Sequence, residues 1–278
     1  MHCHRHPERD AYISCQRCER PICPECMNEA SVGFQCPDCV AHGNRAVRQP
    51  RTLAGGKVSA RVGVVSMVII AINLGVFVLT ELLQLDVLVS QGAMLPVTSF
   101  DPRAGELLRG VDDGAYWRLI TSAFLHANVL HIAFNMYALY LFGPYVQRAL
   151  GTVRFVVAYV TMAVVASVFV YWLSAPNGFT VGASGAVFGL FGLALVLLVR
   201  AREDVRGLLV LLAINALIST QGNISWQGHL GGFVAGLVVG AAIALPTRER
   251  RTLVQVLALA AVWVGVVAAV VVRTAMLS

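Results

Sequence analysis

Long apolar segments alternate with short polar segments along most of the chain after residue 60. A helix that crosses a bilayer needs roughly 20 mainly apolar residues. Seven segments come near that requirement: Val62–Leu83, Trp117–Leu150, Val153–Leu173, Ser184–Val199, Leu208–Thr220, Gly228–Leu245 and Leu253–Val272. The second is too long for one straight span, so we expect its first part to lie at the membrane interface. The pattern predicts an all-α polytopic membrane protein.

Composition supports this prediction and separates a polar N-terminal part from the apolar body. The 278 residues are 57% hydrophobic and 13% charged, which is more apolar than the surface of a soluble domain allows. The first sixty residues are polar and lack the apolar core and cleavage site of a secretory signal peptide. We therefore expect them to stay in the reducing compartment where they are made.

All seven cysteines precede residue 40, which favours metal ligation over disulfides in a reducing compartment. Pairs separated by two residues can bend around a tetrahedral ion, and two pairs complete a structural Zn²⁺ site. Four pairs are present: Cys3 with His6, Cys15 with Cys18, Cys23 with Cys26, and Cys36 with Cys39. The pattern predicts two structural Zn²⁺ ions.

The short gap between Cys18 and Cys23 favours interleaved pairing, with the first and third pairs on one ion and the second and fourth on the other. Three further histidines, His2, His4 and His42, are competing ligands, although we interpret them as solvated surface residues. The segment resembles B-box-type zinc fingers, except that its last pair is Cys and Cys where those fingers usually have His. It is a candidate for binding a cytoplasmic protein partner.

The distribution of Lys and Arg predicts the orientation in the membrane. Most of these residues fall in segments that share one face: Arg45, Arg48, Arg51, Lys57, Arg61, Arg148, Arg154, Arg200, Arg202, Arg206, Arg248, Arg250 and Arg251. The exceptions on the other face are Arg103, Arg109, Arg118 and Arg273. We therefore expect a cytoplasmic N-terminus, an outer C-terminus and a cell-membrane location. This topology explains the net charge of +6 without a nucleic-acid partner, and residues 44–60 form a basic linker that can lie on anionic lipid.

Ser184 and His229 are polar residues at the outer ends of two predicted spans, each among glycines. A lone membrane Ser usually bonds back to its own helix. Here the glycines in "VGASGAVFGL" and "WQGHLGGFVAGL" allow the two helices to approach closely, which would bring the imidazole within reach of the hydroxyl. That pair has the chemistry of a nucleophile and its general base.

"HANVLHIAFNMYAL" adds a third group of polar side chains. His131 and Asn135 lie one helical turn apart, so with the backbone N–H of Ser184 they could stabilise an oxyanion. Asn73 and Asn215 are expected to form hydrogen bonds between helices.

Four motifs together resemble the rhomboid family of intramembrane serine proteases: "GASGAVFG", "GHLGGFVAG", "HANVLHIAFN" and "WR" at 117–118. The resemblance implies a six-helix core at 61–245, here followed by an extra C-terminal helix at 246–278 and preceded by the zinc-binding domain at 1–43. It implies a Ser184 nucleophile, a His229 base and a structural His126, with Trp117 and Arg118 at the end of the first loop. Gly182 opens the nucleophile motif, and Gly185, Gly189, Gly232 and Gly236 lie near the site. Two departures are Phe188, where Tyr is frequent, and Gln147, where Glu is common.

These observations predict an endopeptidase that cleaves single-span or multi-span membrane proteins near the outer face, without a catalytic cofactor. The alternatives are a rhomboid-like protein that binds or dislocates membrane helices without cleaving them, and a transporter. Retention of both Ser184 and His229 disfavours the first, and the lack of a convincing repeat disfavours the second. The preference for Arg over Lys, with Lys57 the sole lysine, suggests a bacterial source.

Overall fold

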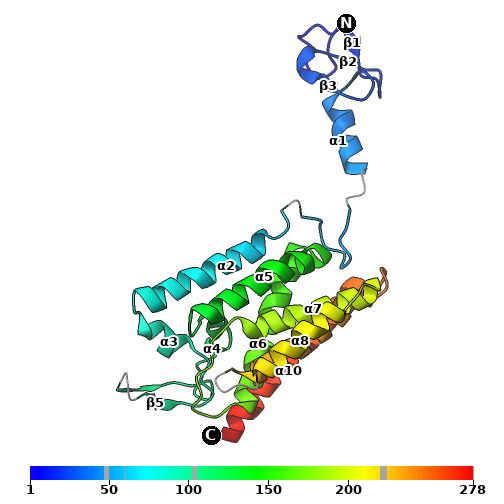
Figure 1. Cartoon of the computed structure of the whole chain (residues 1–278). Helices are drawn as coiled ribbons and strands as arrows, with labels where there is room; N and C mark the ends of the chain where they lie inside the picture. Colours follow the sequence, from blue (N-terminus) through cyan, green and yellow to red (C-terminus); the bar gives the residue numbers. More distant parts are fainter. Residues whose placement is uncertain (47–49, 60, 102–104, 220–223, 278) are drawn as a thin grey trace. The chain divides into compact units, whose positions relative to one another are not determined.

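The structure is a computed structural model that describes residues 1–46, 50–59, 61–101, 105–219 and 224–277. Arg48, Arg103, Thr220 and the first residues of the 221–228 turn lie outside the described residues. The chain divides into two compact units, Met1–Pro50 and Arg51–Ser278 (Figure 1).

The N-terminal unit is a small fold built from two short hairpins and one helix. Strands β1 (Ile13–Ser14) and β2 (Pro21–Ile22) pair antiparallel, as do β3 (Asn28–Glu29) and β4 (Phe34–Gln35), with a 3₁₀ turn, η1 (Pro24–Cys26), between the hairpins. Helix α1 (Pro37–Ala46) follows. Cysteine side chains make up most of the buried cluster in this unit, so its interior is not a conventional hydrophobic core.

The second unit is helical, and its long helices run side by side (Figure 1). Its helices and turns are α2 (Val64–Phe77), continued by the π-helical turn η2 (Val78–Leu82), α3 (Asp86–Gly92), α4 (Arg118–Thr121), η3 (Ser122–Phe124), α5 (Val129–Leu150), α6 (Thr152–Leu173), α7 (Ser184–Ala201), α8 (Arg206–Ser219), α9 (Trp226–Ala244) and α10 (Arg251–Leu277). One short hairpin, β5 (Ser99–Asp101) with β6 (Glu106–Leu108), lies in the loop before α4.

The helical unit confirms the predicted class of fold. Among the described residues, six helices are long and apolar enough to cross a membrane. The expected division of 117–150 is also present, because α4 and η3 precede a separate α5. The described part of α8 has 14 residues and is therefore about 21 Å long, which is shorter than the roughly 30 Å of a bilayer's hydrocarbon core.

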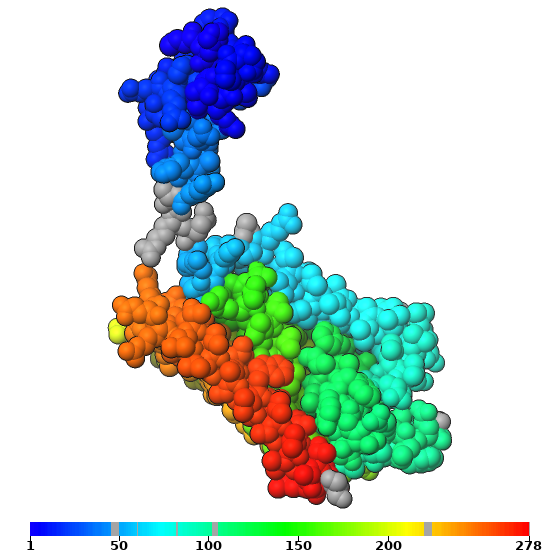
Figure 2. Space-filling model, turned by 180° about the vertical axis from the view of Figure 1, so that it is seen from behind, coloured from blue at the N-terminus to red at the C-terminus, as the bar shows by residue number. Residues whose placement is uncertain are grey.

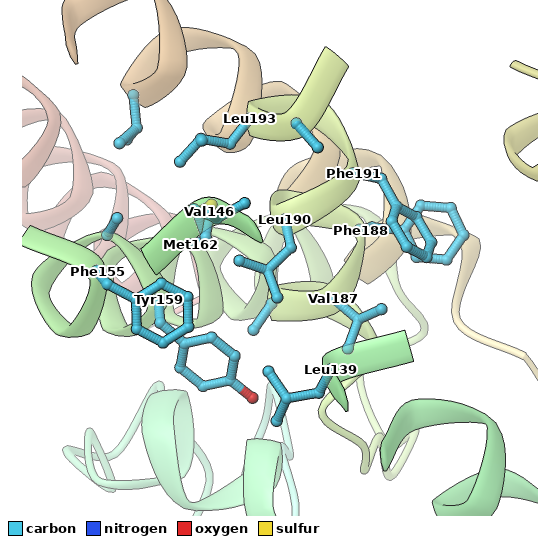
Figure 3. Packing of buried hydrophobic residues seen from close by; sticks show 14 of the residues in the cluster. Leu139, Val146, Phe155, Tyr159, Met162, Val187, Phe188, Leu190, Phe191 and Leu193 are labelled. Carbon is cyan, nitrogen blue, oxygen red and sulfur yellow. The ribbon is translucent and has the colours of Figure 1, made fainter. Parts of the chain in front are cut away.

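Helix α7 occupies the core of this unit, between α5, α6 and α9. Side chains from α5, α6 and α7 meet there, among them Val146, Met162 and Leu190 (Figure 3). Helix α10 lies along one face of the helical unit (Figure 2). It is joined to α6 by hydrogen bonds from Trp172 Nε1 to the Ala269 carbonyl (3.1 Å) and between the Tyr171 and Thr274 hydroxyls (2.9 Å).

Glycines allow α7 and α9 to pack backbone against backbone. A Cβ on Gly232 would lie 1.8 Å from the Gly185 carbonyl oxygen, and one on Gly236 would lie 2.0 Å from that of Gly189. The missing side chains of Gly185 and Gly189 instead face α6, where a Cβ would meet Ala166 and Met162. The sequence predicted close α7–α9 packing, and the structure places glycines that permit it on both helices, because a Cβ on Gly192 of α7 would lie 2.4 Å from the Phe233 carbonyl oxygen of α9.

Two polar residues differ from their expected roles. Asn73 and Asn215 donate through Nδ2 to the carbonyls of Ile69 and Leu211, four residues earlier in their own helices, at 2.8 Å in both cases. The expectation of hydrogen bonds between helices was therefore wrong for these donors, since the preceding turn supplies a nearer acceptor.

Gln147 joins two helices. Its side-chain oxygen accepts a hydrogen bond from the Gly63 N–H at 3.0 Å and thereby anchors the start of α2.

Candidate functional site

Ser184 is the first residue of α7, and the extended loop before it is fixed by two hydrogen bonds. The Gly182 N–H donates to the Ser122 carbonyl at 2.9 Å. The Ala183 N–H points to His126 Nε2 at 3.5 Å. His126 is buried and is therefore a structural support for the loop, whereas the Ser184 side chain is only half-buried.

Gly182 brings the backbone before Ser184 close to the His131 imidazole. Its φ is +130°, a conformation that favours glycine. A Cβ at this position would lie 2.6 Å from His131 Nε2 and 3.6 Å from Ser184 Oγ. The Ser184 hydroxyl and the His131 imidazole therefore lie close together beside Gly182.

The imidazole of His131 is oriented by backbone contacts at the start of α5. The Ala127 N–H points to His131 Nδ1 at 3.5 Å, which leaves the ring proton on Nε2, facing Gly182. Asn135 is buried one turn later, and its Nδ2 donates to the His131 carbonyl at 3.0 Å. The Asn135 amide has a second N–H, so the predicted pair of donors is compatible with the structure.

His229 lies in the first turn of α9 and packs on α7. Its ring is stacked on Phe188, with centroids 4.0 Å apart and planes 8° from parallel. Phe188 lies one turn beyond Ser184, so the stack places the imidazole against the face of α7 that carries the hydroxyl. Within the described residues, Ser184 Oγ and His229 form no hydrogen bond, and such a contact is often long in a protein without substrate.

A hydroxyl that the sequence analysis did not single out contacts the other side of the His229 ring. Ser219, at the end of α8, places its Oγ 2.6 Å from His229 Nδ1. A signal was present in the sequence, since an apolar helix here ends in Ser and Thr. Periodicity within one helix could not reveal the contact, because the two residues belong to different helices.

The Trp117 and Arg118 pair fastens the long loop that precedes α4. Arg118 is fully buried and donates to the carbonyls of Arg109 (2.8 Å) and Ala93 (2.7 Å). Trp117 Nε1 donates to the Gln91 carbonyl at 2.9 Å. Both residues thus hold the backbone around the site and do not themselves line it.

A cavity of about 30 Å³ adjoins Ser184 and is lined partly by the hydroxyls of Ser122, Ser167 and Ser225. This volume suffices for a water molecule with polar partners. A larger groove of about 310 Å³ lies between α6, α9 and α10, but its lining is apolar and includes neither Ser184 nor His229. Of these two cavities, only the small one adjoins Ser184.

The N-terminal unit gathers its Cys and His side chains into two groups of four. The groups are Cys3, His6, Cys23 and Cys26, and Cys15, Cys18, Cys36 and Cys39. Within each group the ligand atoms lie within 4.8 Å of one another. This arrangement agrees with the interleaved pairing expected from the sequence.

Distances within the groups match a tetrahedral zinc site. Zn–S bonds of about 2.3 Å at tetrahedral angles place two sulfurs about 3.8 Å apart, and Cys18 Sγ lies 3.7 Å from Cys36 Sγ. His6 Nδ1 lies 3.3 Å from Cys23 Sγ and 3.5 Å from Cys26 Sγ, close to the roughly 3.6 Å of an S–Zn–N edge. The 3.7 Å between the sulfurs of Cys18 and Cys36 is too long for a disulfide bond.

Backbone N–H groups favour the thiolate form of two of these cysteines. Burial by itself would raise the pKa of the Cys3 thiol, but N–H groups led by that of Cys23 lower it to about 6. Burial likewise opposes ionisation of Cys15, whose pKa falls to about 6 because the Cys36 N–H donates to its Sγ at 3.2 Å. The thiolate is the form that binds metal.

Among the other histidines, His4 is not simply solvated as expected. It is half-buried, and its ring nitrogens contact the Pro21 carbonyl and the Asp38 carboxylate, both at 3.2 Å. It also lies near Cys36 and Asp38 in a third group of possible ligands. Because Cys36 already belongs to a complete group of four, we interpret His4 as a residue that lies beside that group and is not one of its ligands.

Comparison with known proteins identifies the helical unit. The Rhomboid domain model matches residues 113–246, which include Ser184, His229, His131 and Asn135. The putative rhomboid protease YdcA of Bacillus subtilis (strain 168) is 34% identical over 148 residues, which cover 51% of this chain and 74% of that protein.

Other relatives match over a similar stretch. The rhomboid protease GluP of Bacillus subtilis (strain 168) is 33% identical over 143 residues, or 49% of this chain and 28% of GluP. The rhomboid protease AarA of Providencia stuartii is 26% identical over 167 residues, or 50% of this chain and 59% of AarA. The Rhomboid domain match and the 34% identity to YdcA, which extends over 74% of that protein, agree with the helical core. This multi-pass membrane chain therefore belongs to the rhomboid family.

Proposed function

We propose that the chain is an intramembrane serine endopeptidase in which Ser184 is the nucleophile and His229 the general base. The observation that carries the proposal is the closeness of Ser184 Oγ and His131 Nε2, both of which lie near the position of a Cβ on Gly182. The stack of His229 on Phe188, on the same helix as Ser184, supports it. The relatives named as rhomboid proteases support the same class of reaction.

In the proposed reaction, Ser184 Oγ attacks the carbonyl carbon of a substrate peptide bond while its proton passes to His229 Nε2. The oxygen that becomes negative is stabilised by His131 Nε2–H, the Asn135 amide and the Ser184 backbone N–H. The C–N bond then breaks, and His229 gives its proton to the leaving amine. Water attacks the acyl-enzyme, loses its proton to His229, and releases Ser184 with that proton.

The proposed substrates are membrane proteins with one or more spans, cleaved near the outer face. The half-buried Ser184 and the small polar cavity beside it support access of water to this depth. The excess of Lys and Arg on one face supports a cell-membrane protein with a cytoplasmic N-terminus and an outer C-terminus. The composition favours a bacterial source.

For the N-terminal unit we propose a B-box-like domain with two structural Zn²⁺ ions. Three thiolates with one imidazole, and four thiolates, are ligand sets that Zn²⁺ prefers, and the measured separations fit both groups. When bound, zinc would supply the folding free energy that this small unit's interior lacks. A cytoplasmic protein is the proposed partner of this domain.

The protease proposal is tested with purified full-length protein reconstituted with a single-span substrate. We expect release of a fragment by the wild type, and reaction of Ser184 with a fluorophosphonate. Ser184→Ala should lower cleavage to background, about 10⁴-fold or more. Ser90→Ala is a matched control, because Ser90 Oγ bonds only to its own helix in α3. The absence of both labelling at Ser184 and substrate cleavage would instead favour a protein that only binds membrane helices.

A further inference from the structure

The imidazole of His229 has a second polar contact that the proposed mechanism does not use. Ser219 Oγ lies 2.6 Å from His229 Nδ1, and the Ser219 side chain is buried, with a 6% exposed fraction. The two residues belong to different helices, α8 and α9. A hydrogen bond this short in a buried setting constrains the ring.

The hydrogen bonds of Ser219 determine which atom donates the proton. Ser219 Oγ also lies 2.7 Å from the Asn215 carbonyl oxygen, which can only accept a hydrogen bond. The single hydroxyl proton of Ser219 must therefore point to Asn215, since the opposite choice would leave two oxygens in close contact without a proton between them. Consequently His229 Nδ1 must supply the proton in its contact with Ser219.

This arrangement sets the tautomer of the neutral imidazole. With the proton on Nδ1, the lone pair lies on Nε2, the atom that must accept the Ser184 proton. The stack on Phe188 fixes the plane of the ring, and the Ser219 contact fixes its rotation within that plane. Among the described residues, no carboxylate is hydrogen-bonded to His229, so this role falls to a neutral hydroxyl backed by a helix carbonyl.

We propose that Ser219 is a positioning residue for His229, accepting its Nδ1–H and thereby holding Nε2 ready as the base. The inference rests on the proposed Ser184 and His229 dyad. It assigns to Ser219 the orienting role that an acidic residue has in Ser-His-Asp triads. It also places α8 in direct contact with the base.

The test compares full-length Ser219→Ala, Ser219→Thr and Ser219→Val in the reconstituted cleavage assay. Loss of the hydroxyl should lower kcat about 10- to 100-fold, the effect typical of outer partners of functional histidines, and should leave KM unchanged. Ser219→Thr should restore kcat, whereas Ser219→Val, which has nearly the same volume, should not. Thr80→Val is the control, because Thr80, in η2, also donates to a carbonyl four residues earlier, that of Val76 in α2.

A spectroscopic measurement separates positioning from general destabilisation. Nitrogen NMR of labelled histidine should show His229 protonated on Nδ1 in the wild type and in Ser219→Thr, and shifted toward the Nε2-protonated form in Ser219→Ala. The His229→Gln spectrum assigns the signal. Equal kcat for Ser219→Thr and Ser219→Val, or an unchanged tautomer in Ser219→Ala, would overturn the inference.

The same experiment keeps the two proposals distinct. If Ser184→Ala still cleaves, the dyad itself is wrong. If Ser184→Ala is inactive while Ser219→Ala and Ser219→Val cleave like the wild type, only the role of Ser219 is wrong. If Ser219→Ala fails to fold, the volume-matched Thr and Val pair decides the question.

Discussion

The lack of a side chain at Gly182 leaves room for the His131 imidazole beside Ser184. The position of its missing Cβ lies 2.6 Å from His131 Nε2, so any side chain would displace that imidazole. The backbone there, with φ of +130°, adds strain for every residue that has a Cβ.

Gly182→Ala should therefore impair cleavage while leaving Ser184 and His229 intact. We expect kcat to fall about 10²- to 10³-fold, the usual cost of losing one oxyanion donor. The measurement is steady-state cleavage in proteoliposomes. Gly75→Ala in α2, where a Cβ would have nothing within 4 Å, is the matched control. Wild-type kcat in Gly182→Ala would show that the His131 imidazole is not needed as an oxyanion donor.

At the scale of single residues, the sequence predicted which polar side chains lie together on one helix. It did not predict contacts between side chains of different helices. His131 and Asn135 share a face because of helical periodicity, and the structure keeps them together at the start of α5. The contact between Ser219 and His229 joins two different helices, so helical spacing gives no guide to it. Asn73 and Asn215 were predicted wrongly because local back-bonding competes with bonds between helices.

At the scale of helices, the close packing of α7 and α9 is what brings His229 to the face of Ser184. The Gly232 and Gly236 positions touch the carbonyls of Gly185 and Gly189, so the two backbones leave no room for a methyl group. Small residues at a helix interface were visible in the sequence. The sequence did not show which neighbouring helix each glycine faces, because this depends on how each helix is rotated about its axis.

Gly232→Ala should push α9 away from α7 and destabilise the helical unit. Overpacking of this kind costs about 1–3 kcal/mol, which corresponds to a fall in apparent Tm of several degrees. Cleavage should fall with it, since the base moves with α9. Thermal unfolding and cleavage are measured together, with Gly265→Ala in α10, an open position, as control. An unchanged Tm together with full activity would mean that the two helices are packed less closely than described.

At the scale of the whole molecule, the chain joins two units with different sources of stability. The helical unit has an apolar core, whereas the interior of the N-terminal unit is mostly cysteine. Composition and cysteine spacing predicted both units. The interleaved grouping of ligands was also predicted from spacing, because the gap between Cys18 and Cys23 is short, and the structure brings the same residues together.

The double variant Cys3→Ser with Cys23→Ser tests this grouping directly. In the interleaved arrangement both residues belong to one group, so the full-length protein should retain about one Zn²⁺ per chain, compared with about two in the wild type. In a sequential arrangement the same two changes would disrupt both groups, and no stoichiometric zinc would remain. Metal analysis of the purified protein distinguishes the outcomes, with Ser14→Ala as a control that leaves all eight ligands in place.

Cleavage by the purified chain tests the central claim most directly. Wild-type protein reconstituted with a single-span substrate should release one fragment whose new end lies near the outer face of the membrane. Ser184→Ala, purified and reconstituted in the same way, should release none. Equal release of that fragment by wild type and Ser184→Ala would contradict the assignment of Ser184 as the nucleophile.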